Sequence, residues 1–342
     1  MSHTPRPLQP GVYCPLLTFF HPDTEDLDIS AFQTHLLHLV RAGIHPVIAG
    51  SNGEGPHLSH TERQTLITTA RQTLDVAGFS HVPIIAGAGA ISTRETVELC
   101  NEAESAGADY VLVITGGYFA GALKSDREAL KGFYKEVAEK SKVPVLIYNY
   151  PGASGGIDLD SDIIVDLAKE CPNIVGVKLT CSNVGKLTRI TSVVSSPTFA
   201  SAYPRKNIVS SDTPFLVLGG YSEILLSSVY GRGHGCITGL ANLFPHAIAK
   251  LYTLIASSHS SVSDPSTLEK AQQLQGIIAN ADYIIAKAGF TGTKAILEKL
   301  RGYGGKPRRP LLLFGEVETE RLWGNEYIRE MIKFEGEAEV KE

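Results

Sequence analysis

Two stretches of this chain decide its fold: Val143–Pro151, which reads VPVLIYNYP, and Asn173–Lys178, which reads NIVGVK. Both are short apolar runs rich in β-branched residues and bounded by turn-forming residues, so both predict buried strands. Tyr148 lies at the end of the first run and Lys178 at the end of the second. A lysine in that position carries a desolvation cost unless the protein uses its amine. The two runs therefore predict a buried sheet with a chemical site at its edge.

Similar apolar runs recur along the chain, separated by longer stretches with helical periodicity. Helices are expected, for example, over Ile29–Ala42, Thr61–Leu74, Thr93–Ala106 and Arg127–Ser141. Two capping boxes are predicted, Ser59-x-x-Glu62 and Ser92-x-x-Glu95. The runs that predict strands are Val12–Thr18, Pro46–Ala49, Pro83–Ala88, Tyr110–Ile114, Val143–Tyr148, Ile174–Lys178, Phe215–Leu218 and Gly235–Thr238.

Strands that alternate with helices are typical of βαβ units and a parallel sheet. Eight such units in about 240 residues predict an α/β fold of the (β/α)8 TIM barrel type, whose active site lies at the carboxyl ends of the strands. Lys178, Tyr148 and the pair Ser51-Asn52 all fall at such ends. A doubly wound open sheet is the structural alternative, because periodicity alone does not exclude it.

The strand signal ends near residue 257. We therefore expect a (β/α)8 catalytic barrel over residues 8–257 and a C-terminal helical appendage over residues 258–342. Periodicity predicts three helices in the appendage: Pro265–Ala279, Asp282–Leu300 and Glu316–Phe334.

One connection fits the repeat poorly. Ser195–Thr213 is long and contains Pro197 and Pro204. Long connections inside compact domains usually have a function of their own. We expect an insertion near the face formed by the carboxyl ends of the strands, where it would reshape the site.

Composition excludes several classes of protein. The chain has 342 residues, of which 43% are hydrophobic, and its net charge of −5 gives no general attraction to nucleic acid or anionic membranes. The sequence contains no apolar run of about 18 residues, so no membrane span is expected. The first seven residues lack the apolar core of a secretory signal. The five cysteines are scattered, which favours reduced thiols and gives no support for a metal site. A cytoplasmic location is expected, with a mitochondrial one left open.

Lys178 is the candidate nucleophile. A primary amine condenses with a ketone to form an iminium, which is an electron sink for breaking a neighbouring carbon–carbon bond. Burial among Val175, Val177 and Leu179 would favour the neutral amine that this chemistry needs. The alternative is a lysine that extends to the barrel rim or pairs with a carboxylate.

Two further features accompany this lysine. Tyr148 offers a phenol that could protonate the carbinolamine hydroxyl and later accept the proton of a substrate hydroxyl. The loop Gly50–Gly55, GSNGEG, is rich in exposed backbone N–H groups, and such loops bind anions, here a substrate carboxylate. Glu54 is expected to brace this loop.

The residues resemble the dihydrodipicolinate synthase / N-acetylneuraminate lyase family of class I pyruvate aldolases. Single motifs of this kind are moderately specific, whereas four in order at barrel-strand spacing are strong. The four segments that carry the resemblance are GSNGE at 50–54, YNYPGASGGIDL at 148–159, NIVGVKLT at 173–180 and GHGCITGLANLFP at 233–245.

The resemblance implies roles for individual residues and no cofactor beyond the covalent Schiff base. Lys178 would form that Schiff base, Tyr148 would be the acid/base group, and Ser51 and Asn52 would bind the pyruvoyl carboxylate. Tyr118 would reach the site of a neighbouring subunit in a homo-oligomer, usually a tetramer built as a dimer of dimers. The positions implied to line the pyruvate pocket are Gly219, Gly220 and Ile237.

One departure from the family pattern bears on the substrate. Where dihydrodipicolinate synthases carry an arginine that binds a second carboxylate, this chain has Ala153. The resemblance therefore favours cleavage of a 2-keto-3-deoxy sugar acid, such as 2-keto-3-deoxy-L-galactonate, to pyruvate and an aldehyde, as in fungal members. The alternatives are a 4-hydroxy-2-oxoglutarate aldolase, a dihydrodipicolinate synthase and a non-catalytic pyruvate-binding barrel. A metal-dependent barrel enzyme would need convergent His, Asp or Glu residues at strand ends, which the sequence does not offer.

Overall fold

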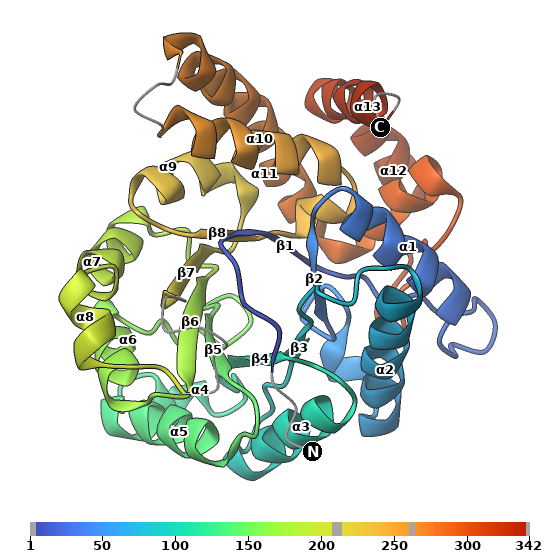
Figure 1. The fold of residues 1–342 in the computed structure, drawn as a ribbon. Helices are drawn as coiled ribbons and strands as arrows, with labels where there is room; N and C mark the ends of the chain where they lie inside the picture. The colour runs from blue at the N-terminus through green and yellow to red at the C-terminus, as the bar shows by residue number, and fades with distance from the viewer. Residues whose placement is uncertain (1–4, 207–213, 260–263, 340–342) are drawn as a thin grey trace.

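The computed structural model describes residues 5–206, 214–259 and 264–339. Within these residues, eight parallel strands form a closed barrel in sequence order, and β1 pairs with both β2 and β8 (Figure 1). This closure confirms the predicted TIM barrel and excludes the open sheet. The strands are β1 Gly11–Pro15, β2 His45–Ile48, β3 Ile85–Gly87, β4 Tyr110–Ile114, β5 Val145–Asn149, β6 Ile174–Leu179, β7 Leu216–Gly219 and β8 Gly235–Ile237.

The helices that follow the strands form the outer ring of the barrel (Figure 1). The four helices whose bounds were predicted begin and end within about two residues of those bounds, because their apolar faces repeat with helical period. Short 3-10 helices lie at three loops, η1 Gly55–His57, η2 Ser222–Ile224 and η3 Gly239–Asn242. The α-helices of this ring are α1 Ile29–Arg41, α2 His60–Val76, α3 Thr93–Ser105, α4 Ala120–Leu123, α5 Arg127–Lys140, α6 Ser161–Glu170, α7 Val184–Val194, α8 Pro197–Ala202, α9 Leu225–Tyr230 and α10 Pro245–Ser258.

The two predicted capping boxes have different outcomes. At α2 the box is complete, because Ser59 accepts from the backbone of Glu62 and the Glu62 side chain accepts from the backbone of Ser59. At α3 only the first half forms: Ser92 accepts from the backbone N–H of Glu95. The Glu95 carboxylate instead lies 3.9 Å from His60 on the neighbouring helix. The second box is therefore half wrong, because a pairing across helices replaces the local one.

The barrel interior is closed at the amino ends of the strands. Tyr13 and Tyr110 fill it there, each at most 1% exposed. The backbone N–H of Leu8 donates to the Tyr110 hydroxyl at 3.1 Å, and that hydroxyl donates to the carbonyl of Arg6 at 2.7 Å. The residues before β1 thus plug this end, which leaves the carboxyl ends as the open face.

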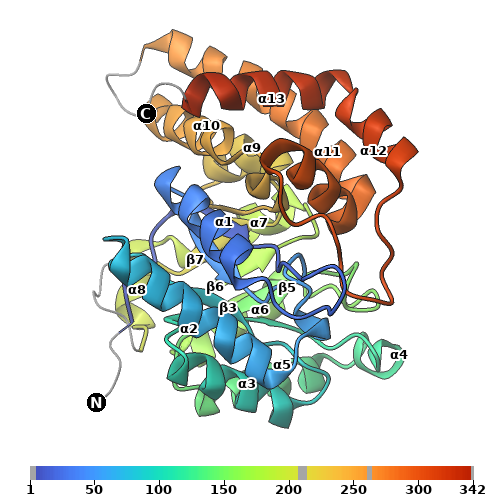
Figure 2. The ribbon, with the colours of Figure 1, turned by 90° about the vertical axis from the view of Figure 1, so that its right-hand side faces the viewer.

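The C-terminal helices form the predicted extension, but their bounds differ from those expected. One long helix, α11 Pro265–Arg301, runs through the expected break near residue 280 and is interrupted at Gly289, whose φ is 67°. Asp282, expected at a helix start, lies inside α11 and is 3% exposed. Figure 2 shows α11 beside α10 against one side of the barrel.

The last expected helix is two helices, α12 Glu316–Trp323 and α13 Glu326–Glu339, divided at Gly324-Asn325. The Asn325 side chain accepts from the backbone N–H groups at the start of α13, which favours a new helix there.

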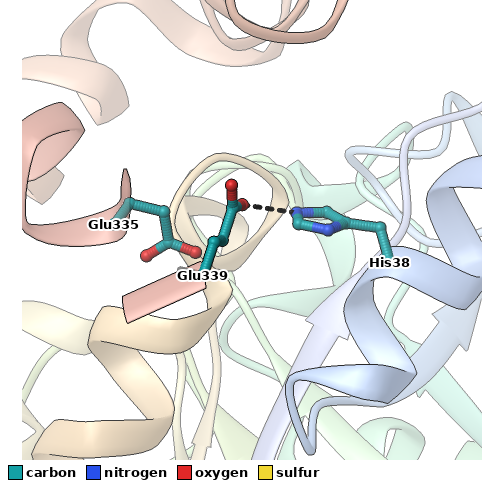
Figure 3. Close-up of side chains that lie close together, drawn as sticks. All are labelled: His38, Glu335 and Glu339. Carbon is teal, nitrogen blue, oxygen red and sulfur yellow. Dashed lines mark ion pairs between the residues drawn. The ribbon is translucent and has the colours of Figure 1, made fainter. Parts of the chain in front are cut away.

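A polar cluster fixes α13 against the barrel (Figure 3). Glu335 accepts from the backbone N–H of His246 at 2.9 Å, at the start of α10, and Glu339 forms an ion pair with Arg301. His38 on α1 lies 4.0 Å from Glu339. Because each carboxylate already has a partner, this cluster is an anchor for α13.

The described part of the connection before β7 lies away from the expected face. Arg205 donates to the carbonyls of Cys171 and Ile174 at 3.2 and 3.0 Å, and the backbone N–H of Lys206 donates to the carbonyl of Pro172. Ile174 is the first residue of β6, so these residues lie at the amino ends of the strands. The expectation that they reshape the site is wrong for residues 195–206, and residues 207–213 lie outside the described ranges.

Within the described ranges, no helix combines the length and the apolar character needed to cross a membrane.

Candidate active site

Two neighbouring strands bring the candidate nucleophile and the candidate acid/base together. Tyr148 on β5 and Lys178 on β6 are directly paired in the strand register. The Lys178 Nζ lies 4.2 Å from the centre of the Tyr148 ring, and the two residues are 4% and 5% exposed. No carboxylate of the described residues forms an ion pair with Lys178. Lys178 therefore neither extends to the barrel rim nor pairs with a carboxylate of the described residues.

The loop after β2 adds a hydroxyl and an amide to this pair. The Ser51 Oγ lies 3.4 Å from the Tyr148 hydroxyl, within reach for relaying a proton. Asn52 lies against Gly239 at the start of η3, where an added Cβ would come within 2.3 Å of the Asn52 amide nitrogen. A side chain at position 239 would thus displace Asn52, so the glycine keeps room for this amide.

Glu54 holds the same loop in place through residues near the C-terminus. Glu54 adopts a left-handed conformation with φ of 53° and is 2% exposed. Its carboxylate accepts from Lys294 on α11 at 2.5 Å and from the backbone N–H of Arg308 at 2.9 Å. Burial lowers the pKa of Lys294, and the neighbouring Glu54 counteracts that effect. The predicted bracing role of Glu54 thus has a physical form, a buried ion pair with α11.

A cavity of about 280 Å³ opens in front of these residues. Ser51, Asn52, Tyr148 and Lys178 line it on the barrel side. The helix α11 supplies the facing wall, with Asp282, Ile285, Ala286, Gly289, Phe290 and Thr293. The kink at Gly289 falls within this wall. The extension is therefore part of the candidate site.

The remaining expected site residues lie in different places. Gly220 lines the cavity, and an added Cβ there would come within 2.2 Å of the Thr180 hydroxyl. Gly219 ends β7 behind it, and Ile237 is fully buried in the barrel interior, so neither is a wall of the cavity. Tyr118 is 80% exposed and is not part of the cavity of its own chain.

Sequence reasoning missed several residues of the cavity. Asp282 is one, because its place depends on how α11 crosses the barrel. Thr180 is another: its hydroxyl is buried without a hydrogen-bond partner among the described residues and borders the cavity. Its position two residues after Lys178, on the same side of the chain, was the signal that could have found it. Tyr221 lines the cavity beside Tyr150, and burial raises the pKa of its phenol.

This arrangement has the groups needed for amine catalysis. A buried primary amine, a phenol above which it lies and a hydroxyl in reach of that phenol share one cavity. The amine can attack a carbonyl, and the phenol can exchange protons with the adduct. Among the described residues that line the cavity, Lys178 is the one basic side chain and Asp282 the one carboxylic side chain.

Comparison with known proteins agrees with this arrangement. The family model described as the dihydrodipicolinate synthetase family matches residues 9–320. The L-threo-3-deoxy-hexylosonate aldolase of Aspergillus niger is 39% identical over 92% of this chain and 93% of its own. A protein of Emericella nidulans named "Probable 4-hydroxy-2-oxoglutarate aldolase, mitochondrial" is 39% identical over 98% of both chains.

Solved structures give the same result. The crystal structure of a dihydrodipicolinate synthase family protein from Coccidioides immitis has a TM-score of 0.80 at 33% identity, covering 98% of this chain and 100% of that one. Both the sequence matches and this structure span the barrel and the C-terminal helices. The chain belongs to the dihydrodipicolinate synthetase family.

Proposed function

We propose that this protein is a class I aldolase that cleaves a 2-keto-3-deoxy sugar acid to pyruvate and an aldehyde. The observation that carries the proposal is the buried, unpaired Lys178 amine above the Tyr148 ring in an open cavity. Two fungal relatives whose names match this reaction and its alternative support it. No cofactor is required, because the Schiff base itself supplies the electron sink.

The reaction begins when Lys178 attacks the C2 ketone of the substrate. Tyr148 protonates the carbinolamine hydroxyl, water leaves, and an iminium forms. The phenolate of Tyr148, directly or through Ser51, then accepts the proton of the C4 hydroxyl. The C3–C4 bond breaks, the aldehyde leaves, and the electron pair moves to the iminium to give an enamine. Protonation at C3 and attack of water release pyruvate and restore the amine.

The loop Gly50–Gly55 would orient the substrate for this step. Its Ser51 and Asn52 lie beside the amine and would bind the C1 carboxylate, which places C2 against Lys178. Ala153 also lines the cavity and provides no cation for a second carboxylate. This disfavours a dihydrodipicolinate synthase reaction, since bidentate binding of carboxylate is what arginine supplies.

The 4-hydroxy-2-oxoglutarate aldolase reaction is the second candidate. It is favoured by the Emericella nidulans relative and by a protein of Coccidioides immitis whose name also contains 4-hydroxy-2-oxoglutarate aldolase, 37% identical over 90% of this chain and 91% of its own. Both reactions use the same Lys178 chemistry and differ in the aldehyde half of the substrate.

The test is the mass of the intact protein after incubation with pyruvate and borohydride. Wild-type protein should gain one reduced pyruvate adduct per chain, and Lys178→Ala should gain none while keeping its melting temperature within a few degrees. The variant should also lose at least about a thousandfold in kcat, the scale of deleting a nucleophile. A wild-type protein without an adduct would favour the non-catalytic pyruvate-binding barrel.

We further propose a homotetramer in which Tyr118 reaches the cavity of a neighbouring subunit. The exposure of Tyr118 supports this, as does Phe119 beside it, which is 57% exposed. Light scattering of wild-type protein and of Tyr118→Ala tests the assembly, and mixing that variant with Lys178→Ala tests whether sites are shared. The compartment is proposed to be the cytoplasm, although the names of two relatives contain the word mitochondrial.

A further inference from the structure

The helix α11 carries a carboxylate into the cavity that the proposed reaction does not use. Asp282 is 3% exposed and lines the same cavity as Lys178. Burying a carboxylate is costly, and here burial raises the pKa of Asp282 to about 6. Because burying the Asp282 carboxylate costs stability, we expect this residue to contribute to the function of the cavity.

The two oxygens of Asp282 have different surroundings. Oδ2 accepts three hydrogen bonds, from the backbone N–H and the hydroxyl of Ser222 at 2.7 and 2.6 Å and from the backbone N–H of Glu223 at 3.0 Å. These bonds fix the carboxylate against the start of η2. Within the described ranges, no donor reaches Oδ1. One oxygen is therefore held by the protein and the other is left for a ligand.

The rest of this cavity offers hydroxyl groups and no second cation. Thr180 contributes a buried hydroxyl without a partner, and Tyr150, Tyr221 and Thr293 contribute others nearby. Lys178, the one basic side chain of the described lining, is bonded to C2 in the Schiff base, beside the C1 carboxylate and away from the aldehyde half. A substrate tail with hydroxyl groups would find an acceptor in Asp282 and partners in these hydroxyls. A tail with a carboxylate would meet a like charge at Asp282.

We propose that Asp282 determines specificity by binding the hydroxyl groups of the aldehyde half of the substrate through Oδ1 and by repelling substrates with a second carboxylate. This inference rests on the proposed function. It selects a neutral polyhydroxy tail, as in 2-keto-3-deoxy-L-galactonate, over the dianion 4-hydroxy-2-oxoglutarate. Asp282 is a binding residue here and takes no part in breaking the bond.

The experiment compares kcat/KM for these two acids in wild-type protein and in Asp282→Asn. Wild-type protein should prefer the deoxy sugar acid by at least about tenfold. In Asp282→Asn, the kcat/KM for that acid should fall about tenfold or more, because a charged acceptor is lost. The value for 4-hydroxy-2-oxoglutarate should stay or rise, so that the ratio moves at least tenfold toward the dianion. A wild-type preference for the dianion would overturn the inference.

Ser222→Ala is the matched control. It removes one hydrogen bond to Oδ2 but leaves the charge and Oδ1 in place. The kcat/KM values for the two acids should then change together, and their ratio should stay within about threefold of the wild-type ratio. If Ser222→Ala shifts the ratio as far as Asp282→Asn does, the carboxylate acts only as a brace for η2 and the inference fails.

Pyruvate trapping with borohydride separates this inference from the proposed function. Pyruvate has no aldehyde half, so Asp282→Asn should form the Lys178 adduct as fully as wild-type protein. A normal adduct with an unchanged substrate ratio would reject the role of Asp282 and leave the aldolase intact. If Asp282→Asn does not fold, a wild-type preference for the dianion 4-hydroxy-2-oxoglutarate still overturns the inference. Absence of the adduct in wild-type protein would reject the proposed function instead.

Discussion

In the proposed mechanism, the hydroxyl of Tyr148 carries out the proton transfers. Tyr148→Phe removes the hydroxyl and leaves the ring on which the Lys178 amine rests. We expect kcat to fall about 10²–10⁴-fold, the range of general acid–base catalysis, with KM changed less than about threefold. Steady-state kinetics with the sugar acid measures both. If Tyr148→Phe changes KM alone, Tyr148 is not the group that transfers the proton.

At the same scale, Lys178 and Tyr148 could be found in the sequence because each breaks an apolar run at the end of a strand. Ser51 and Asn52 followed from their glycine-rich loop. Asp282 could not be found this way. Its sequence neighbours predict a polar position near a helix start, and its burial depends on the path of α11 past η2. Contacts between segments 60 residues apart are invisible to local periodicity.

Among the elements, α11 and the loop Gly50–Gly55 depend on each other through one buried pair. Glu54→Gln would leave the Lys294 amine, which is fully buried, without its counter-charge. We expect a loss of about 3–5 kcal/mol in the free energy of unfolding, as for one partner removed from a buried ion pair. Urea unfolding measures this.

The double variant Glu54→Gln/Lys294→Met is the control for that loss. Because it leaves no unpaired charge, it should recover a large part of the stability lost by Glu54→Gln alone. If the stability lost by the double variant equals the sum of the losses of Glu54→Gln and Lys294→Met, the two residues do not stabilise each other. That result would refute the coupling of the loop to α11.

The strands and the surrounding helices were predictable because short apolar runs and a period of 3.6 residues set them locally. Two of the elements that differ from the expected ones depend on contacts that local periodicity does not show. The break in α11 lies at Gly289, where the chain bends along the cavity wall, and no local polarity marks it. The position of the described residues before β7 is set by Arg205. Its hydrogen-bond partner Ile174 begins β6, about 30 residues away in the sequence.

For the whole molecule, buried histidines set the response to acid. Burial lowers the pKa of His35 to about 3 and those of His45 and His234 to about 4. The unfolded chain binds these protons near pH 6.5 and the folded chain does not, so stability falls as pH decreases from about 7 toward 4. Asp282, with its raised pKa, acts in the opposite sense near pH 6 and offsets part of this loss.

Each such histidine should contribute about 1.4 kcal/mol per pH unit to this slope. Replacing His45 by glutamine isolates one of them, since the His45 ring packs against Tyr13 and no hydrogen bond to its imidazole occurs among the described residues. Urea unfolding at pH 5, 6 and 7 should show a shallower slope in His45→Gln than in wild-type protein. Equal slopes in the two proteins would mean that His45 takes up its proton in the folded state.

The wall that α11 provides has a consequence for how the protein is made. The last barrel strand, β8, ends at Ile237, whereas the cavity needs residues up to Thr293, and the loop that holds Ser51 needs the backbone of Arg308. A ribosome completes the sheet and Lys178 well before it completes the cavity wall. Catalytic competence therefore arrives late in synthesis, and a chain released early would carry a lysine open to water instead of a working enzyme.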